Sequence, residues 1–127
     1  MKDLPDGLHV GLCGAGSPMA DPLRSGPCVA VVAGKDLFVV DSGSGSTRNL
    51  LLMNMPPPRV SAVFITHYHS DHIADLGELM LQRWAGGASK TPMPVYGPQG
   101  LEQVVQGFEQ AYTLDRGYRI AHHGEAV

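Results

Sequence analysis

Apolar residues near the start of the chain fall into short runs separated by turn-forming residues. Three such runs, each bounded by Gly, Pro or Asp, predict strands over 8–13, 28–33 and 37–40. The residues Gly34-Lys35-Asp36 between the last two runs predict a hairpin. Because these two runs are apolar at almost every position, we expect both faces of their strands to be buried.

The rest of the chain combines strand and helix patterns. Two further apolar runs predict strands over 60–65 and 93–96. Apolar residues three or four positions apart predict helices over 48–55, 70–86 and 98–112, and no element is predicted after the last of these. The order of the elements predicts an α/β fold, with one mixed β-sheet and flanking helices.

Length and composition limit the class of protein. The chain has 127 residues, of which 43% are hydrophobic and 17% charged, so we expect a single globular domain over 1–127. The net charge of −3 gives no overall attraction for a polyanion, so we expect a small-molecule substrate, with nucleic acid, held by a local basic patch, as the less favoured alternative. No apolar run approaches the roughly 18 residues that span a membrane. We therefore expect no membrane association.

Cys13 and Cys28 are the only cysteines. Each lies in an apolar, strand-like segment, and two thiols do not make a disulfide framework. We therefore predict that both are free thiols buried as small hydrophobic side chains. Free thiols favour a cytoplasmic protein.

Five of the six histidines lie in two groups, which are His67-Tyr68-His69-Ser70-Asp71-His72 and His122-His123. Two histidines that are two positions apart on an extended segment point the same way, so one ion can contact both His67 and His69. Asp71 and His72 follow where the predicted strand gives way to a helix, and they suit a second ion or a bound water. Imidazole and carboxylate are typical ligands of Zn²⁺, with Mn²⁺ and Fe²⁺ as alternatives.

The histidine motif after a buried strand resembles the metallo-β-lactamase superfamily. Shorter segments at 14–18, 24–27, 40–43 and 71–76 are similar to the ribonuclease Z-type branch of that family. By this resemblance, His67 and His69 bind one metal ion. Asp71 and His72 bind the other. Asp41, at the end of its strand, orients a ligand imidazole from outside the set of ligands.

The resemblance also implies an αββα sandwich of two similar halves, of which this chain matches only the first. The later half supplies further ligands and covers the sheet. We therefore expect a homodimer in which a second copy covers the apolar face, by a two-fold axis. His122 or His123, from the same chain or from its partner, is the candidate third ligand and would leave the fourth position to water.

The glycine-rich segments at 14–17 and 41–47 lack the pattern of a phosphate-binding loop, and we expect tight turns that bring backbone close to the histidines.

The motif and the resemblance together predict a metal-dependent hydrolase. A zinc-activated water would attack a phosphodiester or another small ester, a lactone or a sulfate ester. Asp71 and His72 are the candidate catalytic residues, and Asp71 orients the water and accepts its proton if only one ion is bound. A β-lactam hydrolase is the alternative enzyme. The alternative from another class is a non-catalytic zinc-binding half-domain that acts in assembly.

Overall fold

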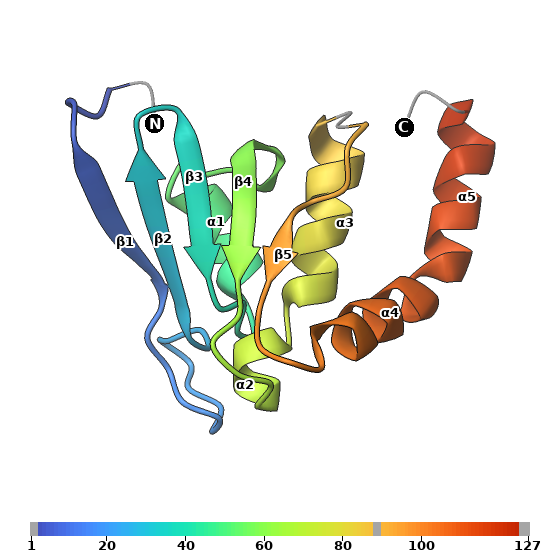
Figure 1. The fold of residues 1–127 in the computed structure, drawn as a ribbon, viewed down its shortest axis with the longest axis horizontal. Helices are drawn as coiled ribbons and strands as arrows, with labels where there is room; N and C mark the ends of the chain where they lie inside the picture. Colours follow the sequence, from blue (N-terminus) through green and yellow to red (C-terminus); the bar gives the residue numbers. More distant parts are fainter. Residues whose placement is uncertain (1–2, 88–89, 125–127) are drawn as a thin grey trace.

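The part of the chain that the computed structural model describes, residues 3–87 and 90–124, forms one five-stranded sheet with helices (Figure 1). In spatial order, the strands are β1 (Leu8–Gly14), β2 (Cys28–Ala33), β3 (Asp36–Val40), β4 (Val60–Phe64) and β5 (Val95–Tyr96). β1, β2 and β3 pair antiparallel, whereas β4 runs parallel to both β3 and β5. The prediction of an α/β fold with a mixed sheet is confirmed.

The helices are α1 (Ser46–Leu52), α2 (Ser70–Ile73), α3 (Leu76–Gly87), α4 (Leu101–Ala111) and α5 (Thr113–His123), and a single 3-10 turn spans Pro57–Arg59. In the view of Figure 1, α1 lies behind the sheet, and α4 and α5 extend beyond its β5 edge. α3 packs against both the 3-10 turn and α4.

One face of the sheet forms the core. Alternate side chains of β2 and β3, such as Val32 and Leu37, are fully buried, and they pack with Leu50 of α1 and Leu76 of α3. The residues between them in β2 and β3 are only partly buried. The prediction that both faces are buried is therefore wrong, because no described residue forms a layer over the second face.

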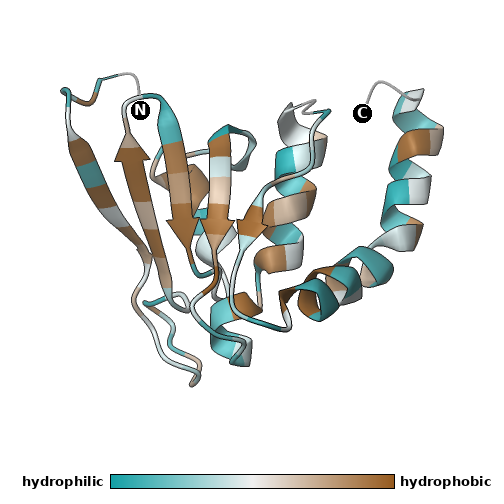
Figure 2. Cartoon of the chain, in the orientation of Figure 1, coloured by the Kyte–Doolittle hydropathy of each residue, from teal (hydrophilic) through white to brown (hydrophobic). Residues whose placement is uncertain are grey.

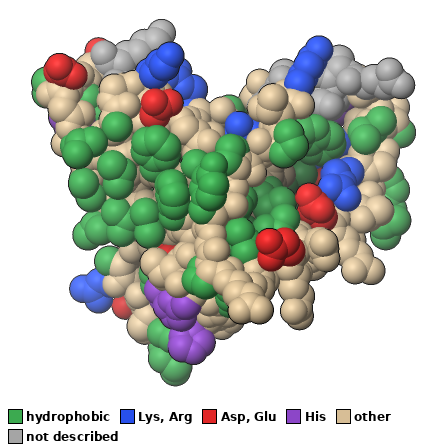
Figure 3. All heavy atoms as spheres, in the orientation of Figure 1, with side chains coloured by type: hydrophobic (Ala, Val, Ile, Leu, Met, Phe, Trp, Pro, Cys, Tyr) green, Lys and Arg blue, Asp and Glu red, His purple; other side chains and the backbone are tan. Residues whose placement is uncertain are grey.

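The second face of the sheet is apolar and exposed. Its outward side chains include Leu8, Val10 and Leu12 of β1, which are 75%, 68% and 66% exposed. Farther across, the ring of Phe64 stacks on that of Tyr96 with centroids 5.3 Å apart. Figure 3 shows hydrophobic side chains gathered over the strands on this face, and Figure 2 shows the strands coloured mostly as hydrophobic. An exposed apolar surface that crosses a whole sheet is typical of an interaction face.

Cys13 and Cys28 form a disulfide, so the prediction of two free thiols is wrong. Both residues are buried, as predicted. β1 pairs antiparallel with β2, and an irregularity between Leu12 and Gly14 places the extra residue Cys13 beside Cys28. Their Cα atoms lie 5.0 Å apart, within the span of a disulfide. Hydropathy gives no information on the register of two strands, so it could not predict this bond. Because the thiols are not free, they no longer support the expected cytoplasmic location.

Two helices differ from the sequence prediction. The helix expected over 70–86 is broken into α2 and α3, because Asp75 makes bonds outside the helix. Its N–H donates to the carbonyl of Ser42 at 2.9 Å, and its carboxylate accepts the N–H of Thr47 at 2.8 Å. The helix α5 was not predicted, although Leu114, Tyr118 and Ala121 recur at helical spacing in the sequence. In the structure Leu114 and Tyr118 are exposed.

Candidate metal centre

The residues 66–72, here called the histidine loop, lie where β3 and β4 end. The loop leads from β4 into α2, and its last residue is tied to the segment after β3. The N–H of Asp41 donates to the carbonyl of Phe64 at 2.8 Å, and the N–H of Ser42 donates to that of His72 at 2.8 Å. The carboxyl ends of parallel strands are the usual place for ligand sites in α/β sheets.

Asp41 is the centre of the hydrogen bonds in this region. Its side chain is almost fully buried, and its φ of 61° lies in the left-handed region, which Asp tolerates better than most residues. Its carboxylate accepts from the backbone N–H of Thr66 at 2.8 Å and lies 2.7 Å from Nδ1 of His72. Because an ionised carboxylate can only accept, this contact favours the proton on Nδ1 of His72, which in a neutral ring leaves a lone pair on Nε2.

The same reasoning assigns the other two imidazoles. The hydroxyl of Thr66 lies 2.8 Å from Oδ2 of Asp41 and donates to it, so at 2.9 Å it accepts from Nδ1–H of His67. Nε2 of His67 then accepts from Nδ1–H of His69 at 3.0 Å. These hydrogen bonds therefore favour the same neutral tautomer in His67, His69 and His72, with an unprotonated Nε2 in each.

The three imidazoles and Asp71 lie close together. The ring of His67 lies 4.1 Å from that of His72 and 4.7 Å from that of His69, measured between centroids. Oδ2 of Asp71 lies 3.6 Å from Nε2 of His72. Within residues 3–87 and 90–124, no three His, Cys, Asp or Glu side chains are already arranged around one ion. In the histidine loop, a mutual hydrogen bond occupies Nε2 of His67. The residues fit zinc by donor type and tautomer, and binding requires that this bond open.

His122 and His123 lie elsewhere. Both belong to the last turn of α5, and their rings are 4.6 Å apart. In Figure 1 this end of α5 is at the top of the molecule, whereas α2 and the histidine loop are at the bottom. The structure therefore does not bring either residue to the loop within one chain.

Two residues of the histidine loop were missed by the sequence reasoning. Thr66 links Asp41 to His67, and its only sequence signal is that it directly precedes the first histidine of the motif. The hydroxyl of Tyr68 donates to the carbonyl of Pro98, which ties the loop to the turn before α4. Desolvation and the carboxylate of Glu102 raise the pKa of Tyr68 above its ordinary value, so the hydroxyl keeps its proton.

Of the two glycine-rich segments, the turn at 41–47 approaches the histidine loop, as predicted, whereas Gly14 and Gly16 lie against the backbone of residues 24–26 instead. A Cβ placed on Gly43 would lie 2.6 Å from the carbonyl oxygen of Asp71, and one on Gly26 would lie 3.1 Å from the same atom. Backbone therefore packs directly on backbone here, with no room for a side chain.

A family model described as the metallo-beta-lactamase superfamily matches residues 21–125, so the chain belongs to the metallo-β-lactamase superfamily. Within it, a ribonuclease Z from Mycolicibacterium gilvum (strain PYR-GCK) is 41% identical over 120 residues, which cover 93% of this chain and 42% of that protein. The match is to the N-terminal part of such relatives. This chain thus spans about two fifths of their length.

Solved structures agree with the family. The short form of human tRNase Z superposes with a TM-score of 0.75 at 27% identity, over 82% of this chain and 40% of that one. The metallo-β-lactamase fold protein YhfI from Bacillus subtilis superposes with a TM-score of 0.67 at 30% identity, over 78% of this chain and 40% of that one.

None of the helices in the described residues is long and apolar enough to cross a membrane.

Proposed function

We propose that this chain is a zinc-dependent hydrolase that cleaves phosphodiester bonds in RNA. The observation that carries the proposal is the hydrogen-bond network around Asp41, which favours an unprotonated Nε2 on three neighbouring histidines. The similarity to proteins named ribonuclease Z supports RNA as the substrate. The earlier expectation against nucleic acid rested on net charge, which describes the whole chain and not the surroundings of one site.

We assign His67 and His69 to one ion and Asp71 and His72 to the other, with Mn²⁺ or Fe²⁺ as alternative metals. A bound divalent ion would lower the pKa of a water molecule to near neutrality and polarise the scissile phosphoryl group. Asp41 holds the imidazole of His72 in the ligand tautomer. If only one ion binds, Asp71 orients the attacking water and accepts its proton.

A second copy of the chain is proposed to cover the exposed face of the sheet. The support is the row of Leu8, Val10 and Leu12 on β1, continued by Phe64 and Tyr96 across the sheet. A two-fold axis would bury the same apolar surface on both copies. Only such a partner could then bring His122 or His123 to the histidine loop, and their role as ligands stays a prediction.

Light scattering after size-exclusion chromatography tests the dimer. We expect twice the 13.5 kDa of one chain. Leu12→Glu, on the exposed sheet face, should lower the mass to that of a monomer. Leu23→Glu should not, because Leu23 lies in the segment between β1 and β2 and is 90% exposed. A stable wild-type monomer would contradict the proposal.

The activity is tested with an assay panel. Purified protein is incubated with Zn²⁺, and separately with a chelator, on an RNA with a 3′ extension, an aryl phosphodiester, an aryl ester, a lactone, a sulfate ester and a β-lactam. We expect metal-dependent cleavage of the RNA and the phosphodiester, which His67→Ala abolishes. Turnover of only the ester, lactone, sulfate ester or β-lactam would refute the assigned substrate and select that activity. Bound zinc without any turnover would favour the non-catalytic half-domain.

The cytoplasmic location also stays a prediction. Buried disulfides are rare in the reducing cytosol, so the Cys13–Cys28 bond is the observation against it.

A further inference from the structure

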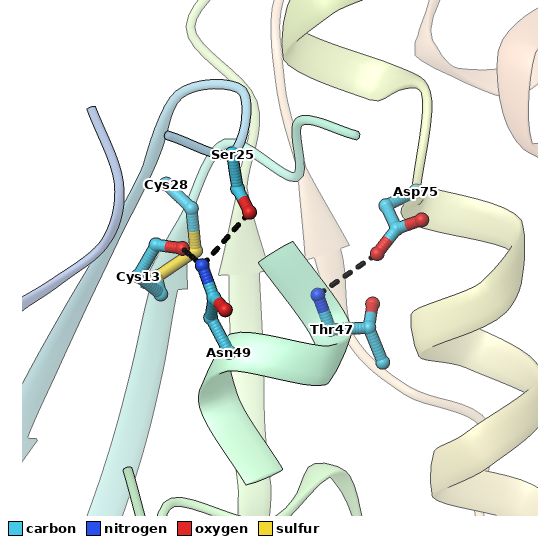
Figure 4. The surroundings of a disulfide bond; sticks show 6 residues. All are labelled: Cys13, Ser25, Cys28, Thr47, Asn49 and Asp75. Atoms are coloured by element: carbon cyan, nitrogen blue, oxygen red, sulfur yellow. Dashed lines mark hydrogen bonds between the residues drawn. A yellow bond between two sulfur atoms is a disulfide. The ribbon is translucent and has the colours of Figure 1, made fainter. Parts of the chain in front are cut away.

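The segment 14–27, here called the disulfide loop, is closed at its base by the bond between Cys13 and Cys28 (Figure 4). The two cysteines are 0% and 1% exposed. Asn49 of α1 adds a second restraint, because its side-chain amide donates to the carbonyl of Cys13 at 2.9 Å and to the hydroxyl of Ser25 at 2.8 Å. The start and the end of the loop are therefore fixed to each other and to α1.

The end of the disulfide loop packs on the segment after β3. The N–H of Gly26 donates to the carbonyl of Ser44, and that of Gly43 donates to the carbonyl of Pro27, both at 2.9 Å. A Cβ on Gly43 would lie 2.5 Å from the nitrogen of Pro27. The backbone of Pro27, next to Cys28 in sequence, is thus in direct contact with residues 43–44.

The same segment contacts the histidine loop on its other side. Gly43 lies against the carbonyl of Asp71, and the N–H of Ser42 donates to the carbonyl of His72. Pro27, Gly43 and Asp71 therefore form a continuous backbone stack between the disulfide and the candidate metal ligands. Close-packed backbone transmits displacement, because it contains no flexible side chain that could absorb it.

We propose that the Cys13–Cys28 disulfide positions Asp71 and His72 through Pro27 and Gly43, and thereby tightens zinc binding. This inference rests on the proposed zinc site. The bond fixes Cys28, and with it the neighbouring Pro27, to Cys13 of β1. Without the bond, the disulfide loop is held by hydrogen bonds alone, and fewer molecules carry Asp71 and His72 in the binding arrangement. Apparent affinity falls in proportion to that fraction.

The test compares zinc affinity with and without the bond. The dissociation constant for Zn²⁺ alone is measured by competition with a chromogenic chelator, in wild type and in the double variant Cys13→Ser/Cys28→Ser. We expect about tenfold weaker binding in the double variant. Val32→Ala is the matched control, because Val32 is also buried in β2 but lies at the opposite end of the strand from Cys28. It pairs with His9 of β1, away from the disulfide loop. It should lower stability and leave the zinc affinity unchanged.

A spectroscopic signal separates positioning from general destabilisation. The visible absorption of Co²⁺ bound in place of zinc reports ligand geometry, and we expect it to change in the double variant and not in Val32→Ala. Equal affinity and equal spectra in wild type and double variant would overturn the inference while leaving the zinc site intact. If neither protein binds zinc, the proposed function itself is wrong.

Two measurements do not require the double variant to fold. When wild type is denatured without reduction and alkylated, mass spectrometry should find both cysteines unmodified. Two alkylated cysteines would overturn the inference. Wild type can also be unfolded, reduced with a phosphine and refolded, because the buried disulfide is not accessible in the folded chain. The phosphine becomes its oxide as one water and the disulfide give two thiols. After the phosphine is removed, the reduced chain should bind zinc more weakly, and unchanged affinity would contradict the proposal.

Discussion

Replacement of Asp41 separates its contribution to stability from its contribution to metal binding. Three donors bond to its carboxylate, which are the N–H and hydroxyl of Thr66 and Nδ1–H of His72. A hydrogen bond to a charged group contributes about 1.5–3 kcal/mol. Asp41→Ala removes all three, but water can reach some of the freed donors, and the desolvation of the carboxylate is relieved. We expect a net loss of about 3 kcal/mol.

Asp41→Asn keeps the shape of the side chain and its tolerance of the left-handed backbone. If its oxygen still accepts from the N–H of Thr66, its NH₂ group faces Nδ1 of His72. His72 can pair with this donor only by moving its own proton to Nε2, the nitrogen that a metal needs. We therefore expect a stability loss of only about 1 kcal/mol, but a 10- to 100-fold loss of zinc affinity, the range typical of residues that orient metal ligands.

Urea denaturation of the metal-free proteins and zinc competition titrations measure the two effects. Asp36→Asn is the control, because Asp36 begins the same strand but lies at the end away from the histidine loop. Its carboxylate accepts a hydrogen bond from the hydroxyl of Ser61 at 3.1 Å. Its zinc affinity should equal that of wild type. Wild-type zinc affinity in Asp41→Asn would refute the tautomer argument.

Three further predictions concern the glycine turn, the helix end and the tyrosine. Gly43→Ala should lower the free energy of unfolding by about 3 kcal/mol, because the new methyl group overlaps backbone on two sides. Gly107→Ala in α4 should raise it by about 1 kcal/mol, because the new methyl group meets nothing within 4 Å. Thermal melts in which both variants behave alike would contradict this prediction. His122→Ala/His123→Ala should lower the zinc bound per chain if the partner's helix supplies a ligand, and unchanged stoichiometry by elemental analysis rejects that role. Tyr68→Phe should cost about 1 kcal/mol in urea denaturation, by loss of the bond to the turn before α4, and an unchanged midpoint would show that the bond contributes nothing.

The candidate ligands could be named from the sequence because they are local. His67, His69, Asp71 and His72 lie within six consecutive positions, directly after a run of apolar residues. The donor types and the change from strand to helix spacing are properties of that short segment. The same holds for the five strands, each of which is a short apolar run bounded by turn residues.

Features that join distant segments do not follow from local patterns. The family resemblance implied that Asp41 orients a ligand imidazole, and the structure shows that this imidazole belongs to His72. Asp41 and His72 are 31 positions apart, and neither their 2.7 Å contact nor the link through Thr66 follows from spacing. Cys13 and Cys28 meet because β1 and β2 pair in one particular register with one extra residue. The helix break at Asp75 likewise depends on partners in another part of the chain.

The sequence by itself named the candidate metal ligands as a prediction, and it determined which segments are strands and the class of fold. The tertiary structure decided the hydrogen-bond partners of the histidines, the disulfide, and which face of the sheet is exposed. The physical reason is that hydropathy and propensity describe each residue in its local segment. Register and packing are set by contacts over the whole chain, and a shift of one residue in a strand changes every partner on it.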